Sequence, residues 1–205
     1  ILMSENDVNN YKRLTNKNNV ICIPHGINTN FYFPTETSRE KSVLIVGNWL
    51  RDFSFAESVI DQLLETSEDL TINLVINKAN MSKYIGSSRV NYFSHISDEA
   101  LRDLYQNSGL LFLPLFAFTA NNAVLEAAAC GCPIIISCDN FDETYFSSNQ
   151  ILFTEKNNLV YNEILRMLSK SDNCSENIVA YVNENFSWEV IGKKTNKVFN
   201  NVLSY

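Results

Sequence analysis

The segment LLFLPLFAFTANNAVLEAAACGCPIII, residues 110–136, contains the pattern that decides the fold. Its first four residues, 110–113, form a short apolar run of the kind found in strands covered on both faces. A loop of small residues and an alanine-rich helix follow, and Gly131 is placed to end that helix. Pro133 then opens a second apolar run, 133–136. Strand, helix and strand in this order predict a parallel sheet.

The same alternation extends over the chain before this segment. Further short β-rich runs occur at residues 20–23, 42–46 and 71–76, and most of them are apolar on successive positions. Helical patterns separate several of these runs. The chain is therefore expected to form a doubly wound α/β fold, in which ligands bind at the carboxyl ends of the strands.

Two of the intervening helices are predicted from apolar residues that recur three and four positions apart. The first carries Ala56, Val59, Ile60, Leu63 and Leu64. Ser54 and Glu57 form a potential capping box at its start. The second carries Ala100, Leu101, Leu104 and Tyr105. Ser97 is its expected N-cap.

The C-terminal part of the sequence differs from the rest, because from Asn157 onward the pattern is almost entirely helical. The last helix, for which Ser187 is a plausible cap, has one apolar face formed by Trp188, Ile191, Thr195, Val198 and Val202. A terminal amphipathic helix normally seals a core. The alternative is that its exposed part docks on a domain outside this sequence.

Composition excludes several classes of protein. The 205 residues suffice for one well-filled core, and the net charge of -7 argues against a nucleic-acid partner. No apolar run approaches the roughly 18 residues that a membrane-spanning helix needs, and residues 1–3 lead into polar sequence without a signal peptide. The five cysteines lack zinc-finger spacing, so we expect reduced, mostly buried thiols in a cytoplasmic protein.

The loop and helix after residue 118 are the strongest candidate for a ligand site. Small residues at 119–123 let a ligand approach the backbone, and free amides at the helix start favour a phosphate. Glu126 lies one turn inside this helix, where a carboxylate can accept hydrogen bonds from paired hydroxyls such as those of a ribose. The alternative is an ordinary helix in a parallel sheet with a solvated Glu126.

Four segments, in this order along the chain, resemble family-4-type retaining glycosyltransferases (glycosyl transferases group 1) of the GT-B fold. The run from Asn122 through Ile135 is similar to the second half of the signature in which two glutamates bracket the donor-sugar loop. Residues 20–34 resemble the interdomain link of that family, and residues 90–105 its nucleobase-side strand and helix. Residues 186–189 resemble the start of its closing helix.

The resemblance implies a Rossmann-like, nucleotide-sugar-binding half of a two-domain enzyme with a helical C-terminal tail. Residues 1–16 would be the end of a missing N-terminal acceptor-binding domain, and residues 17–34 the link. Residues 35–185 would bind the donor, and residues 186–205 would form the closing helix. The implied activity is metal-independent hexosyl transfer with retention from a nucleoside-diphosphate sugar, with no cofactor, and the isolated fragment is expected to be inactive.

The resemblance also assigns roles to individual residues. Glu126 corresponds to the second glutamate, whereas the first falls at Phe118 and is absent. Arg51 is the best cation for the diphosphate, and its alternative is a surface pair with Asp52. Together with the catalytic pair Arg51 and Glu126, the expected donor-binding residues are Gly47, Asn48, Lys78, Ile96, Thr119, Ala120, Asn121, Asn122 and Ala123.

The sequence also contains two histidines, and it is compatible with more than one function. His25 could touch a ligand at the interdomain cleft, and His95 is expected to pack beneath the nucleobase loop. Thr119, Asn121 or Asn122 could replace the contacts of the lost glutamate. A non-catalytic nucleotide-sugar-binding or assembly module is the main rival, and an epimerase is a third candidate. We expect a role in polysaccharide synthesis in the cytoplasm, with peripheral attachment to the inner membrane through the missing domain left open.

Overall fold

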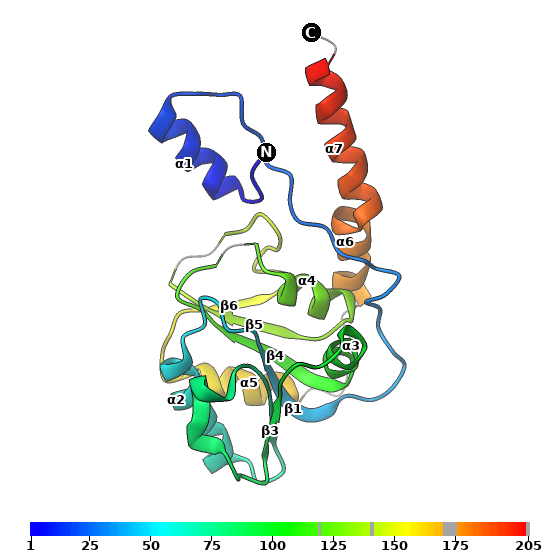
Figure 1. The fold of residues 1–205 in the computed structure, drawn as a ribbon. Coiled ribbons are helices and arrows are strands. Elements are labelled where there is room, and N and C mark those ends of the chain that lie inside the picture. The colour runs from blue at the N-terminus through cyan, green and yellow to red at the C-terminus, as the bar shows by residue number, and fades with distance from the viewer. Residues whose placement is uncertain (119, 140–141, 170–175, 204–205) are drawn as a thin grey trace.

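A computed structural model of the protein describes residues 1–118, 120–139, 142–169 and 176–203 (Figure 1). The strands are β1 (Glu40–Val46), β2 (Thr71–Val75), β3 (Val90–Phe93), β4 (Ser108–Pro114), β5 (Ile134–Ser137) and β6 (Leu152–Thr154). The helices are α1 (Glu5–Thr15), α2 (Phe53–Thr66), α3 (Asp98–Asn107), α4 (Asn122–Ala129), α5 (Val160–Leu168), α6 (Glu176–Phe186) and α7 (Trp188–Leu203), with a 3₁₀ segment η1 (Lys78–Tyr84).

The strands of the described residues form one six-stranded sheet in the order β3-β2-β1-β4-β5-β6. Every neighbouring pair is parallel. The prediction of a doubly wound parallel sheet is therefore confirmed. The order reverses between β1 and β4, and in such sheets the crevice at this switch point is where ligands bind.

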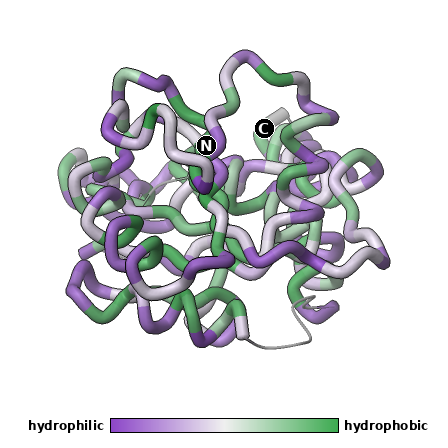
Figure 2. Tube along the Cα trace, turned by 90° about the horizontal axis from the view of Figure 1, so that it is seen from below, coloured by the Kyte–Doolittle hydropathy of each residue, from purple (hydrophilic) through white to green (hydrophobic). Residues whose placement is uncertain are grey.

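The sheet is covered on both faces, because successive side chains of a strand point to opposite sides. Leu44, Leu111 and Leu113 belong to a core that they share with α4 and α6. Val43 and Ile45 belong to a second core with α2 and α5. This two-sided burial explains why the strands are apolar on successive residues. Figure 2 shows that the outer helices, by contrast, carry both hydrophobic and hydrophilic positions.

The structure corrects several local predictions. Residues 20–23 form no strand and make only an isolated bridge, between Cys22 and Leu2. The N-cap of α2 is Asp52, whose side chain accepts a hydrogen bond from the Phe55 amide, so the predicted capping box at Ser54 is wrong. Ser97 caps α3 as expected. The short strand β6 was missed, because its three residues carry no clear pattern.

Two arginines tie together the edge of the sheet where the strands begin. Arg39, just before β1, donates to the carbonyl groups of Tyr105, Gln106, Ser108 and Cys130 at 2.6–3.0 Å. Arg89, just before β3, donates to the carbonyl groups of Leu64 and Ser67 at 2.8 and 2.7 Å. These guanidinium groups satisfy carbonyls at the ends of α2, α3 and α4, which would otherwise lack partners.

The link segment, residues 17–34, meets the junction of α6 and α7. The Ile27 amide donates to the Phe186 carbonyl at 2.8 Å, and the Trp188 amide donates to the Ile27 carbonyl at 3.1 Å. A Cβ atom on Gly26 would lie 2.5 Å from the Trp188 ring, so this position requires glycine. His25 packs edge-on against the same ring, with 5.1 Å between centroids.

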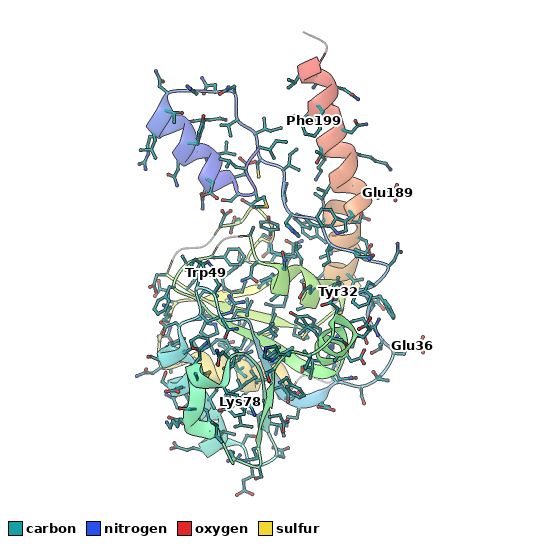
Figure 3. All side chains as sticks on the ribbon, in the orientation of Figure 1. Tyr32, Glu36, Trp49, Lys78, Glu189 and Phe199 are labelled. Carbon is teal, nitrogen blue, oxygen red and sulfur yellow. The ribbon has the colours of Figure 1, made fainter. Side chains whose placement is uncertain are left out.

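Both ends of the described chain extend from one side of the sheet (Figure 1). The segment before α1 contacts the loop after β5, where Ser4 donates to Asp142 and the Tyr145 hydroxyl donates to the Met3 carbonyl. On α7, Ile191 is 5% exposed, but Phe199 is 55% exposed and stands free of the core (Figure 3). The predicted apolar face of this helix therefore seals the core only near its start.

Candidate functional site

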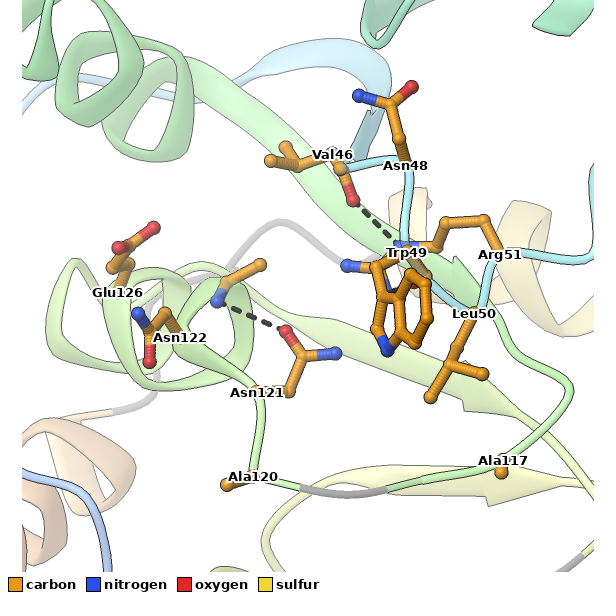
Figure 4. A pocket seen from close by; sticks show the side chains of 12 residues that line it. Val46, Asn48, Trp49, Leu50, Arg51, Ala117, Ala120, Asn121, Asn122 and Glu126 are labelled. Carbon is orange, nitrogen blue, oxygen red and sulfur yellow. Dashed lines mark hydrogen bonds between the residues drawn. The ribbon is translucent and has the colours of Figure 1, made fainter.

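A cavity of about 370 Å³ lies at the switch point of the sheet (Figure 4). Its walls come from the loop after β1, the loop after β4 and the first turns of α4. The lining residues are Val46, Gly47, Asn48, Trp49, Leu50, Arg51, Ala117, Ala120, Asn121, Asn122, Ala123 and Glu126. The structure thus brings Arg51 and Glu126, which are distant in sequence, into one cavity.

The loop after β1 directs Arg51 into this cavity. Gly47 has a φ of +92° and Leu50 a φ of +56°, so the chain turns sharply on both sides of Trp49. The guanidinium group donates to the carbonyl groups of Val46 at 2.8 Å and Trp49 at 3.0 Å. A Cβ atom on Gly47 would lie 2.9 Å from Nη2 of Arg51. Glycine therefore leaves the space that the guanidinium group occupies.

Arg51 is buried, with only 8% of its surface exposed. Burial lowers the pKa of its guanidinium group to about 10, so the group stays protonated at neutral pH. The alternative of a surface pair with Asp52 is wrong, since Asp52 pairs with Lys156 at 2.8 Å. A fixed, desolvated cation of this kind suits a phosphate ligand.

The start of α4 faces the same cavity. Asn121 is its N-cap, and the Oδ1 atom of Asn121 accepts a hydrogen bond from the Ala123 amide at 3.1 Å. The expectation that the Ala123 amide is free is therefore wrong. Within the described part of the chain, no acceptor is bonded to the Asn122 amide. Figure 4 shows the side chains of Asn121 and Asn122 at the N-terminal end of α4.

Glu126 is held by a tyrosine from the neighbouring helix. The hydroxyl of Tyr105, on α3, donates to Oε2 of Glu126 at 2.8 Å. Burial raises the pKa of Glu126 above its ordinary value, and hydrogen bonds from Tyr105 and Tyr32 act in the opposite direction. Glu126 is thus half-buried and hydrogen-bonded to the protein. Phe118, at the position of the missing glutamate, is 7% exposed and packs edge-on against Phe153.

A second cavity, of about 500 Å³, adjoins the first at Asn48, which lines both. It lies at the carboxyl ends of β2 and β3, and its other lining residues are Val75, Ile76, Asn77, Lys78, Phe93, Ser94 and His95. Oδ1 of Asn48 accepts hydrogen bonds from the Asn77 amide and from Nδ2 of Asn80, both at 2.8 Å. Asn48 thus lies at the boundary between the two cavities.

Lys78 lines the second cavity, where its Nζ atom lies 5.8 Å from the centroid of the Tyr92 ring. Figure 3 shows Lys78, at the start of η1, well apart from Trp49 in the loop after β1. His95 is exposed and has a φ of +55°, so the expectation that it packs beneath a loop is wrong. Ile96 is half-buried and lines neither cavity. Thr119 lies outside the described residues.

Three residues of the site were missed as functional candidates. Trp49 is 80% exposed beside the first cavity, and its position two residues after Gly47 was the available signal. Tyr105 was assigned only to an apolar stripe, although its hydroxyl needs a polar partner when buried. Tyr32 belongs to the link segment, and nothing in its spacing relates it to Glu126.

The described residues offer neither a metal site nor a membrane-spanning helix. No group of three or more His, Cys, Asp or Glu side chains in this part of the chain could hold a metal ion. No helix in it is long and apolar enough to cross a membrane. Cys130, Cys132 and Cys138 are buried as expected and Cys22 is half-buried, while Cys174 lies outside the described residues.

Several solved structures have the same fold. Sucrose-phosphate synthase from Thermosynechococcus elongatus matches with a TM-score of 0.80 and 19% identity, covering 99% of this chain and 58% of that one. The C-terminal domain of the glycosyl transferase group 1 family protein LpcC from Francisella tularensis matches with 0.66 and 13%, covering 80% and 100%. Anabaena Alr3699/HepE, solved in complex with UDP and glucose, matches with 0.75 and 13%, covering 98% and 62%.

These identities show the fold alone, and the chain spans 58% of the length of the synthase. No curated protein sequence gives a significant match. The family described as glycosyl transferases group 1, however, matches residues 40–170, which is more than half of the chain. That range contains the whole parallel sheet and both walls of the first cavity. The chain therefore belongs to the glycosyl transferases group 1 family.

Proposed function

We propose that this chain binds the nucleoside-diphosphate-sugar donor of a retaining, metal-independent glycosyltransferase. The observation that carries the proposal is that Arg51 and Glu126 line one cavity at the switch point of the sheet. A cation suited to a diphosphate and a carboxylate suited to ribose hydroxyls then lie at opposite walls of a single site. Alr3699/HepE, which shares the fold, was solved with UDP and glucose, and this makes UDP the first nucleotide to test.

In this proposal the diphosphate lies between Arg51 and the start of α4. As the glycosidic bond breaks, negative charge grows on the leaving phosphate. The fixed guanidinium group and the Asn122 amide would stabilise that charge without moving, because the two carbonyl bonds of Arg51 already orient it. The helix dipole of α4 adds a smaller contribution of the same sign. No metal ion is required for this neutralisation.

With the ribose at Glu126 in the first cavity, the nucleobase would extend past Asn48 toward the second cavity, which Lys78 and His95 line. The sugar and the acceptor would meet at the open side of the first cavity, against an N-terminal domain outside this sequence. Because this chain supplies only the donor half, we expect it to bind nucleotide weakly and to transfer no hexose alone. Polysaccharide synthesis at the cytoplasmic side of a membrane is the corresponding cellular role.

A non-catalytic nucleotide-sugar-binding module is the second candidate, and one observation favours it. The position of the first family glutamate holds Phe118, which is buried against Phe153 with 6.0 Å between ring centroids. This side chain cannot accept a hydrogen bond from a sugar. Only a polar residue from the same loop, such as Asn121, could take over that contact.

Calorimetric titration with UDP, GDP and ADP tests the donor-binding proposal. One nucleotide should bind the wild-type chain, and Glu126→Ala should weaken that binding by about tenfold or more, as expected for lost hydrogen bonds to a charged group. Glu36→Ala, which removes an exposed carboxylate, is the matched control and should bind like wild type. If none of the three nucleotides binds, the proposal is overturned. Hexosyl transfer by the full-length protein would identify a transferase, and its absence would favour the non-catalytic module.

A further inference from the structure

The carboxylate of Glu126 is held by a side chain that no ligand would contact. Tyr105 is 0% exposed, and its hydroxyl donates to Oε2 of Glu126 at 2.8 Å. A buried hydroxyl needs a partner, and this carboxylate is the partner that the structure gives it. The bond occupies one acceptor position of Glu126 and fixes the carboxylate plane, while the remaining lone pairs stay available to other donors.

The link segment packs against this pair through Tyr32. Tyr32 is 9% exposed, and its ring packs edge-on against that of Tyr105, with 6.4 Å between centroids. Its hydroxyl makes a weaker polar interaction with Glu126. The carboxylate therefore has phenol groups from two elements, α3 and the link segment, on its protein side.

The link segment is itself fastened to α3. The guanidinium group of Arg102 lies between the rings of Phe31 and Phe33, at 4.9 and 5.5 Å from their centroids. Nε2 of Gln106 donates to the Phe33 carbonyl at 2.7 Å. These contacts hold Tyr32 in place beside Tyr105, so the geometry around Glu126 depends on how residues 31–33 are seated.

We infer that Tyr105, supported by Tyr32, is a positioning residue that keeps the carboxylate of Glu126 aimed into the first cavity for the vicinal hydroxyls of the nucleoside. This inference rests on the proposed function, because it concerns the carboxylate to which that function assigns the ribose. It goes further in giving the link segment a role in the donor site, although no residue of the segment lines either cavity.

The electrostatics agree with this role. Burial is the largest influence on Glu126 and raises its pKa, while the hydrogen bonds from Tyr105 and Tyr32 lower it. Asp98, on the same helix as Tyr105, is a further charge that raises this pKa. Removing the Tyr105 hydroxyl should therefore raise the pKa of Glu126 further. An ionised carboxylate accepts hydroxyl bonds best, so nucleotide affinity in such a variant should be lost at a higher pH than in wild type.

Tyr105→Phe tests the inference, since it removes the hydroxyl and keeps the ring. Nucleotide affinity is measured by calorimetry between about pH 5 and about pH 8, a range that begins just above the ordinary carboxyl pKa. We expect affinity about tenfold weaker than wild type near neutral pH and an acid midpoint moved to higher pH. Tyr32→Phe should act in the same direction with a smaller effect.

Tyr84→Phe is the matched control. The Tyr84 hydroxyl also donates to a carboxylate, that of Asp61 at 2.9 Å, and is also buried, but it lies on η1 away from the first cavity. It should lower stability without changing the pH profile of nucleotide binding. A second measurement combines variants: adding Tyr105→Phe to Glu126→Gln should cost much less affinity than adding it to wild type.

The outcomes separate the inference from the function on which it rests. If wild type binds nucleotide and Glu126→Gln binds it more weakly, but Tyr105→Phe and Tyr32→Phe keep the affinity and pH profile of Tyr84→Phe, the inference is overturned and the function stands. If wild type binds no nucleotide, both are overturned. If Tyr105→Phe does not fold, the pH profile of Tyr32→Phe decides, and an unshifted acid midpoint overturns the inference.

Discussion

Asp52 forms its ion pair with Lys156, with 2.8 Å between Oδ2 and Nζ, and not with its sequence neighbour Arg51. Both side chains of this pair are nearly enclosed, at 13% and 14% exposure. Asp52 also caps α2 through its other carboxylate oxygen, which accepts from the Phe55 amide. The carboxylate beside Arg51 is thus fully engaged, and the positive charge in the cavity is not neutralised from its own loop.

Arg51→Ala should therefore weaken binding of the nucleoside diphosphate by about 1.5–3 kcal/mol, the usual contribution of a hydrogen bond to a charged group. Arg51→Lys should recover only part of this, because an ammonium cannot bond to both the Val46 and Trp49 carbonyls and still reach a phosphate in the fork geometry. Calorimetry with UDP and uridine measures the effect. An equal loss for uridine would contradict a phosphate role, and Arg13→Ala, on the exposed face of α1, is the control.

Glu126→Gln should stabilise the protein while weakening nucleotide binding. Burial raises the pKa of Glu126, so the ionised carboxyl opposes folding. The sign follows from linkage: this penalty is present above the folded-state pKa and absent below the ordinary value of 4.5, where the group is protonated in both states. The variant should melt above wild type at about pH 8, and the difference should vanish at about pH 4. A lower melting temperature at both values would refute this account.

Trp49 should report ligand binding through its fluorescence. The sequence has two tryptophans, and Trp49 is 80% exposed at the cavity whereas Trp188 lies at the junction with α7. A nucleotide that enters the cavity should change the polarity around Trp49 and shift or quench its emission. Trp188→Phe should keep this response and Trp49→Phe should abolish it. The reverse pattern would mean that the nucleotide binds elsewhere or acts on the junction.

Gly26→Ala should destabilise the protein by about 1–3 kcal/mol, the typical cost of forcing a methyl group into a filled site. The added Cβ would lie 2.5 Å from the Trp188 ring, which would have to leave the junction between the link segment and α7. Urea denaturation measures the loss. Gly192→Ala is the control, since nothing lies within 4 Å of its Cβ position, and this helical position should gain stability.

Much of the fold followed from the sequence because local and tertiary preferences agree there. The apolar runs that became β1, β2, β4 and β5 are buried on both faces, so each residue carried the same signal. The run at 20–23 carried that signal too, but it lies outside the sheet. Periodicity cannot distinguish a strand from an extended segment that packs its side chains against neighbouring loops.

The candidate site was predictable only where ligand residues follow strand ends. Arg51 and Asn121 sit at such ends, and their cavity follows from the strand order. The contact between Tyr105 and Glu126 was not predictable, because the two residues lie on different helices. The apolar stripe that contains Tyr105 predicts a buried side chain but not which residue of another helix it meets. The hydrogen bond from the Ala123 amide to Oδ1 of Asn121 was also not predicted, because a helix start predicts available amides but not which side chain accepts a hydrogen bond from them.

Arg89, just before β3, has a consequence for how this chain can change over evolutionary time. It holds the C-terminal end of α2 at the edge opposite the cavities, so mutations around it alter folding and leave substrate choice alone. Substitutions in the loops at residues 47–51 and 117–123 do the reverse. Specificity and robustness can therefore be selected almost independently, one at each end of the same six strands.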